Sequence, residues 1–197
     1  LFSFTFEKDA AHAVQFGLRN GKEGSYAWDG RVLRGVDVSG ARAGFPVRVY
    51  LHAEFDASPS DVRKAGARTA LFFGAKAETV RMRVGISYIS AEQAERNLRA
   101  EIADFDLERL AAGARDAWNR TLSQVEVEGG TEDERTLFYT ALWRVHERMV
   151  DITEDGRYYS GFDGKVHDAN GVRFYTDDWT WDPFRAAHPL MTILQPR

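Results

Sequence analysis

Cysteine is missing from this sequence of 197 residues. Disulfide bonds and thiolate metal sites are therefore excluded, whichever compartment holds the protein. Basic residues do not dominate either: 26 Lys and Arg stand against 30 Asp and Glu, which gives a net charge of −4. Because a general nucleic-acid-binding protein presents a basic face, this balance argues against that class of function.

Long apolar runs are missing as well. No stretch approaches the roughly 20 residues that a membrane-spanning helix requires, and no signal peptide is present. The sequence opens on Leu1 instead of methionine, so we expect it to be a piece of a longer protein or a processed form. The motifs of a phosphate-binding loop, a nucleophile elbow and a zinc protease are also lacking.

Strand-like alternation fills the first 88 residues. Phe2, Phe4 and Phe6 alternate with polar residues, which is the period of a half-buried strand. The Asn20-Gly21 pair predicts a hairpin between two short strands within residues 13–28. Further strands are expected within residues 31–40, 45–56, 68–76 and 79–90. Strands at this spacing, without helices between them, favour an antiparallel β-sandwich over residues 1–88.

Helical periodicity replaces this alternation after residue 88. Ser90 and Gln93 predict a capping box and a first helix, and a second helix is expected from about Asp106. These two helices suggest a linker over residues 89–130. Thr131 and Glu134 predict another capping box, which opens a helical domain over residues 131–197. Its first helix carries an apolar stripe that needs partners beyond these helices: Leu137, Phe138, Ala141, Leu142, Val145 and Met149.

A turn-rich segment follows this third helix. Asp155-Gly156, Asp163-Gly164 and Asn170-Gly171 are hairpin-type turns. The glycine-rich stretch between them, which contains Tyr158, Tyr159 and Phe162, is either a plain connector or the lining of a ligand cleft. Helical pattern resumes near residue 180, where Pro183 is tolerated in a first turn.

Acids and tryptophans gather where this last helix is expected to begin, in YTDDWTWDPFRAAHPL, residues 175–190. On a helix, Asp178 and Asp182 would share a face, and Asp182 would reach Arg185. One interpretation is structural: capping acids, core tryptophans and a surface ion pair. Another is a sugar subsite, in which a pyranose ring stacks on indole while carboxylate and guanidinium bind its hydroxyls. A local metal site, the third, lacks the EF-hand pattern.

Four ordered segments together resemble glycoside hydrolase family 92, the calcium-dependent exo-acting α-mannosidases. They are RVGISYISAEQAERNL, AWNRTLSQVEVEGGTEDERTLFYTALWRV, DGRYYSGFDGKVH and FYTDDWTWDPFRAAHPLMTILQP, and they extend from about Val80 to Pro196. The resemblance implies the end of an N-terminal antiparallel β-sandwich, a helical linker and the first helices of an (α/α)6 barrel. It also implies that the sequence is an internal fragment, inactive alone.

The resemblance further implies that the parent protein is an α-mannosidase. It would remove terminal α-linked mannose, mostly α-1,2-linked, from glycans by inversion and with calcium. Trp181, Asp182 and Arg185 match a segment of the family's terminal-mannose subsite, and Asp178 is placed with them. Asp182 would bind sugar hydroxyls, Arg185 would orient Asp182 or bind a hydroxyl itself, and Trp181 would form wall or core.

The acid, the base and the calcium ligands lie in later family segments, so we assign none of them to this sequence. Family members are generally exported, which implies a secreted or periplasmic location; the oligomeric state is left open. Asp178, Trp179 and Thr180 replace the commoner Phe-Ser-Leu, and Pro183 replaces the commoner Thr. These departures leave the linkage preference and the substrate open. Two alternative functions stay open as well: a glycan-binding protein without catalysis, and an (α/α)6 glycosidase or phosphorylase of other specificity.

Overall fold

The structure is a computed structural model that describes residues 1–18, 23–39, 45–147, 149–176 and 180–195. Strands come first along the chain: β1 (Phe2–Thr5), β2 (Ala13–Gly17), β3 (Gly24–Trp28), β4 (Val32–Ser39), β5 (Val47–Phe55), β6 (Asp61–Ala65), β7 (Arg68–Phe72) and β8 (Thr79–Ser87). Helices and one hairpin follow: α1 (Ala91–Glu101), α2 (Leu107–Leu122), α3 (Glu132–Val145), β9 (Arg157–Ser160), β10 (Lys165–Asp168) and α4 (Ala187–Leu194). None of these helices is long and apolar enough to cross a membrane.

The first eight strands form two antiparallel sheets, with strand orders β1-β8-β5-β4-β3 and β2-β7-β6. Their apolar faces share one core, where Val14 and Leu71 of the smaller sheet pack with Val80 of the larger. The ring of Phe16 on β2 lies 5.9 Å from the ring of Tyr26 on β3. This arrangement confirms the antiparallel sandwich that the alternating pattern predicts.

The predicted hairpin over residues 13–28 is wrong. β2 pairs with β7 and β3 pairs with β4, so the two strands belong to different sheets. Their apolar residues account for the difference, because Phe16 and Tyr26 meet across the core instead of side by side on one sheet. The Asn20-Gly21 pair lies outside the described residues.

Strand β6 has no counterpart in the sequence prediction. All five of its residues are exposed, and it lies at an edge of the smaller sheet. An edge strand with no buried face lacks the apolar alternation by which strands are recognised. Charged side chains are common on such edges, where they discourage pairing with another chain.

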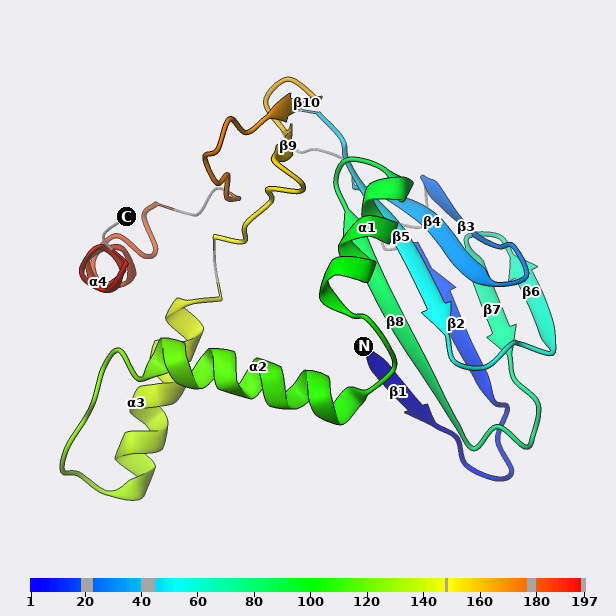
Figure 1. Ribbon diagram of the computed structural model, residues 1–197, viewed down its shortest axis with the longest axis horizontal. Helices are drawn as coiled ribbons and strands as arrows, with labels where there is room; N and C mark the ends of the chain where they lie inside the picture. Colours follow the sequence, from blue (N-terminus) through cyan, green and yellow to red (C-terminus); the bar gives the residue numbers. More distant parts are fainter. Residues whose placement is uncertain (19–22, 40–44, 148, 177–179, 196–197) are drawn as a thin grey trace. The chain divides into compact units, whose positions relative to one another are not determined.

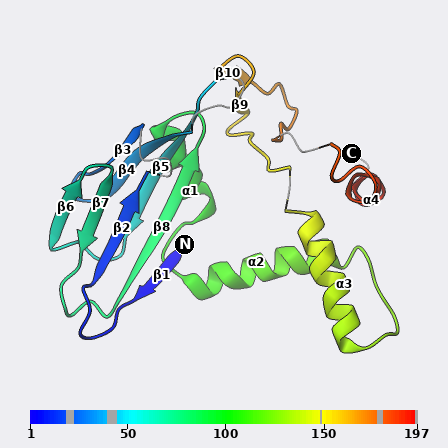
Figure 2. The same ribbon diagram turned by 180° about the vertical axis from the view of Figure 1, so that it is seen from behind.

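Helix α1 packs on β8 and β5 of the larger sheet (Figure 1, Figure 2). The side chains of Ala94 and Leu98 are buried in this interface. Gly85 on β8 permits the close approach, since a Cβ there would lie 2.1 Å from the carbonyl oxygen of Ala94 and 2.7 Å from Cβ of Leu98. The glycine is therefore a packing requirement of the helix.

The described chain divides into two compact units. Unit 1 contains residues 1–107 and 153–172, and unit 2 contains residues 108–152 and 173–197. Helix α1 and the β9–β10 hairpin thus belong to unit 1, whereas α2, α3 and α4 belong to unit 2. The domain limits expected near residues 88 and 130 stay a prediction.

Unit 2 begins with two helices that expose much apolar surface. Thr131 and Glu134 form the complete capping box predicted at the start of α3. Trp118 of α2 meets Trp143 of α3 edge to face, with 5.9 Å between ring centroids. Of the apolar stripe on α3, only Leu142 is buried within the described chain. The stripe therefore still needs the partners that its sequence indicates.

Candidate functional site

Residues 180–186, which carry the predicted Trp-Asp-x-x-Arg motif, form turns instead of the expected start of a helix. The Pro183 carbonyl accepts hydrogen bonds from the backbone N–H groups of Ala186 and His188, and α4 begins only at Ala187. Pro183 has no N–H and disfavours helical backbone at the residue before it, so regular helix begins after this turn. Asp182 is not part of a helix, so the expected helical face shared by Asp178 and Asp182 is not formed at this residue.

The motif side chains are open to solvent in unit 2. Trp181 is 73% exposed, so it lies outside the core of the described chain. Asp182 is exposed too, and it forms no ion pair with Arg185 among the described residues. The guanidinium of Arg185 lies over the ring of Phe184, with 5.4 Å from Cζ to the centroid. An indole, a carboxylate and a guanidinium, each open to solvent, are the groups that a sugar ring can contact.

A short antiparallel pairing of backbone segments precedes the Trp-Asp-x-x-Arg motif. The Ile152 N–H donates to the Phe174 carbonyl at 2.8 Å, and the Thr176 N–H donates to the Val150 carbonyl at 2.9 Å. This pairing joins the chain after α3 to the chain before the motif. Asp178 lies outside the described residues, so its role in the subsite stays a prediction, as do the roles of Trp181, Asp182 and Arg185.

Metal ligation was the third interpretation of these acids. Within the described ranges, no three His, Asp or Glu side chains lie together so that they could hold a metal ion. Asp177 and Asp178, two of the three acids in that interpretation, lie outside the described residues, so the metal site stays an untested prediction.

The β9–β10 hairpin of unit 1 is the second motif that the sequence singled out. Tyr158 and His167 oppose each other across the two strands, and their rings stack with centroids 5.5 Å apart. Nε2 of His167 lies 2.8 Å from Oδ2 of Asp163. Desolvation would raise the pKa of Asp163, but hydrogen bonds from the Lys165 N–H and from His167 outweigh it, so this pKa lies below its ordinary value.

Glu154, which is only 9% exposed, fixes the base of this hairpin to α1. Its Oε1 accepts a hydrogen bond from the Tyr88 backbone N–H at 2.9 Å, and its Oε2 accepts one from Nδ2 of Asn97 at 2.7 Å. Asn97 also donates to the Ile86 carbonyl at 2.8 Å. One buried carboxylate thus joins the end of β8, helix α1 and the hairpin.

Gln93, fully buried at 0% exposure, is the second anchor. Its Nε2 donates to Oδ2 of Asp155 at 2.7 Å, and its Oε1 accepts from Nη2 of Arg157 at 2.8 Å. Hydrogen bonds from Gln93 and Arg96 hold the pKa of Asp155 below its ordinary value. Ser90 caps α1 as predicted, but the capping box is incomplete because the Gln93 side chain binds the hairpin instead.

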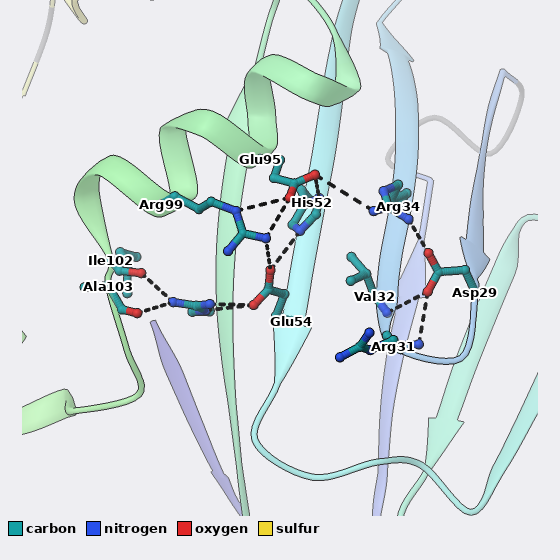
Figure 3. A network of polar contacts seen from close by, with 11 residues as sticks. Asp29, Arg31, Val32, Arg34, His52, Glu54, Glu95, Arg99, Ile102 and Ala103 are labelled. Carbon is teal, nitrogen blue, oxygen red and sulfur yellow. Dashed lines mark hydrogen bonds and ion pairs between the residues drawn. The ribbon is translucent and has the colours of Figure 1, made fainter.

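Helix α1 is itself held on the sheet by a network of charges (Figure 3). His52 is 1% exposed; its Nε2 lies 3.1 Å from Oε1 of Glu54, and its Nδ1 lies 3.7 Å from Oε2 of Glu95. Arg99 of α1 pairs with Glu95 at 2.7 Å and reaches Glu54 on β5 at 3.4 Å. Arg83 on β8 completes the group, with Nη2 2.6 Å from Oε2 of Glu54.

These contacts keep the carboxyl groups ionised. Partial burial of Glu54 would raise its pKa, but hydrogen bonds from Arg83 and His52 outweigh that effect and lower it. The hydrogen bond from Arg99, the largest influence on Glu95, lowers the pKa of that carboxyl. The network therefore fixes α1, and α1 fixes the hairpin.

The sequence contained a local signal for one part of this anchor. Gln93 and Asn97 stand four residues apart on the helix face that also buries Ala94 and Leu98. Polar residues on an apolar face indicate buried hydrogen-bond partners. Nothing local indicated that those partners would be Glu154 and Asp155, about 60 residues away.

Comparison with known proteins identifies the family to which the chain belongs. The model of the glycosyl hydrolase family 92 catalytic domain matches residues 93–197, more than half of the chain. No match was found among curated proteins. A solved inverting mannosidase of family GH92 from Bacteroides thetaiotaomicron VPI-5482 is 30% identical, with a TM-score of 0.71; the match covers 92% of this chain and 26% of that one.

Two further solved structures share the fold. The GH92 family glycosyl hydrolase ccman5 is 23% identical, with a TM-score of 0.79 over 98% of this chain and 29% of that one. A family GH92 α-mannosidase from Bacteroides thetaiotaomicron is 19% identical, with a TM-score of 0.74 over 93% of this chain and 26% of that one. The chain thus spans less than a third of the length of these relatives. With the family match over residues 93–197 and this shared fold of sandwich followed by helices, the chain belongs to glycoside hydrolase family 92.

Proposed function

We propose that the protein containing this chain is an exo-acting α-mannosidase that removes terminal α-linked mannose from glycans. Membership of family 92 is the observation that carries the proposal. The 30% identical relative is an inverting mannosidase, which supports an inverting reaction here. Such a reaction needs an acid and a base about 6.5–9.5 Å apart, with room for water between them.

Residues 181–185 would contribute to the subsite for the terminal mannose. Their exposed indole, carboxylate and guanidinium suit a sugar ring: the indole face contacts the C–H groups, while Asp182 accepts hydrogen bonds from hydroxyls. We further propose that the acid, the base and the calcium ligands lie outside residues 1–197. Preference for α-1,2 linkages, export from the cytoplasm and inactivity of the isolated chain belong to the same proposal.

Mannose release from α-1,2-mannobiose by the full-length protein, with and without a calcium chelator, tests the activity. In the Asp182→Ala variant, kcat/KM should fall roughly tenfold to several hundredfold, because a hydrogen bond to a charged group contributes about 1.5–3 kcal/mol. Asp116→Ala, an exposed aspartate of α2, is the matched control and should keep wild-type kinetics. Unchanged kinetics in a folded Asp182→Ala variant would remove Asp182 from the site. Absence of mannose release by the folded wild type would refute the α-1,2 preference, and absence of release from the other α-linked mannobioses as well would refute the activity.

A further inference from the structure

The tip of the β9–β10 hairpin presents an aromatic ring to solvent. Phe162 is 95% exposed, and it stands between Gly161 and Asp163 in the four-residue loop that joins β9 to β10. The loop has a defined conformation, because the Gly164 N–H donates to the Ser160 carbonyl at 2.9 Å. The Phe162 N–H donates to Oγ of Ser160 at 3.2 Å. The exposed ring is therefore carried on an ordered backbone.

Polar groups able to bind hydroxyls follow Phe162 on the same hairpin. Asp163 follows Phe162 directly, and its carboxylate is ionised and held by the His167 imidazole at 2.8 Å. His167 is held in turn by stacking on Tyr158. A carboxylate of this kind has lone pairs left to accept hydrogen bonds from a ligand. The hairpin tip thus combines an apolar ring face with an oriented acceptor.

The hairpin is also fixed at both of its ends. At the tip, the Tyr159 hydroxyl donates to the Pro46 carbonyl at 2.8 Å, and Phe45 packs so closely that a Cβ on Gly164 would lie 2.8 Å from its ring. At the base, Glu154 and Gln93 hold the hairpin to α1 through partly buried hydrogen bonds. Pre-organised side chains lose little conformational entropy when a ligand binds.

We propose that this hairpin tip, formed by Phe162, Asp163 and His167, is an auxiliary binding surface for mannose-containing oligosaccharides. The inference rests on the proposed function for the class of sugar. A pyranose places its C–H face on an aromatic ring and its hydroxyls on carboxylate and imidazole, and this hairpin tip carries all three groups within six residues. A stable protein interface needs about 800 Å² from each partner. One exposed ring and one acid–imidazole pair match a single sugar unit better than such an interface.

Kinetics of the full-length protein on two substrates test this surface. One substrate is 4-nitrophenyl α-mannoside, which has a single sugar, and the other is a high-mannose oligosaccharide. Phe162→Ala should raise KM for the oligosaccharide roughly threefold to tenfold, the effect of one lost aromatic contact. Both kcat and the kinetics on the nitrophenyl substrate should stay unchanged. Phe162→Tyr keeps the ring and should behave like the wild type.

Phe2→Ala is the matched control, because Phe2 is an exposed phenylalanine on strand β1 of the same unit. Equal KM values for wild type and Phe162→Ala on the oligosaccharide would overturn the proposal. Equal losses on both substrates, with a lower Tm, would also overturn it, because they mean that the ring packs against the rest of the protein.

Calorimetric titration with the same oligosaccharide separates this inference from the proposed activity. A wild type that releases no mannose would refute the activity alone. If it still binds the oligosaccharide, weaker binding by Phe162→Ala than by Phe2→Ala supports the surface. Equal binding by the two variants, or no binding by the wild type, overturns it.

Discussion

Replacing Glu154 with glutamine tests the anchor that holds the hairpin to α1. The wild-type carboxylate uses one oxygen for the Tyr88 N–H and the other for Nδ2 of Asn97. In Glu154→Gln, one oxygen becomes an NH2 group, so one of these two donors faces another donor and loses its acceptor. A hydrogen bond to a charged group contributes about 1.5–3 kcal/mol to stability. Opening of the hairpin should therefore become about 10- to 150-fold more favourable, because each 1.4 kcal/mol is a factor of about ten.

Native-state hydrogen exchange of the full-length protein measures this opening. The Ala169 N–H, which donates to the Gly156 carbonyl at 2.7 Å, is a suitable reporter at the base of the hairpin. Its exchange should accelerate by the same factor, while amides of unit 2 keep their rates. Glu101→Gln makes the same chemical change at an exposed position of α1 and should leave the reporter unaffected. Acceleration of less than about threefold in Glu154→Gln would show that Glu154 does not anchor the hairpin.

Two further predictions concern the packing of α1 on the larger sheet. Gly85→Ala should lower the free energy of unfolding of unit 1 by about 1–3 kcal/mol in urea denaturation, because the new Cβ overlaps the Ala94 carbonyl. Gly74→Ala, which has open space around its Cβ, should change it little, and equal stability of the two variants would contradict the packing argument. The pKa of Glu54 is lowered from its ordinary value of 4.5, so its stabilising effect is complete above about pH 4.5 and is lost as the pH falls through the folded-state pKa. The Tm advantage of wild type over Glu54→Gln should therefore shrink below pH 4.5, and an advantage that stays constant down to pH 3 would contradict it.

Local sequence patterns correctly predicted those strands and helices that are determined by neighbouring residues. The alternation that begins at Phe2 indicated a sandwich, because each strand buries one face. Ser90 and Thr131 marked the starts of α1 and α3, since a helix N-terminus needs side-chain acceptors whatever the tertiary structure. The family of the chain was predicted from four ordered segments taken together, because no single motif was sufficient.

Predictions failed where distant contacts decide the structure. Asn20-Gly21 favours a hairpin locally, yet core packing of Phe16 and Tyr26 assigns the flanking strands to different sheets. The polar anchor was missed because the partners of Gln93 lie far along the chain. One failure has a local cause: a helix was expected from about residue 180, but Pro183 delays regular helix to Ala187.

Unit 1 is assembled from two separate stretches of sequence, and this has a consequence for protein synthesis. A ribosome that has translated as far as residue 107 has made strands β1–β8 and helix α1, but not Glu154 and Asp155. Until the hairpin emerges, Nε2 of Gln93 lacks Asp155 as a partner and Nδ2 of Asn97 lacks Glu154, although Asn97 can still donate to the Ile86 carbonyl. Helices α2 and α3 are made during that interval, so the nascent chain must keep this surface of α1 accessible while unit 2 begins to form. A truncated chain that ends at residue 130 would retain the same unfilled surface permanently.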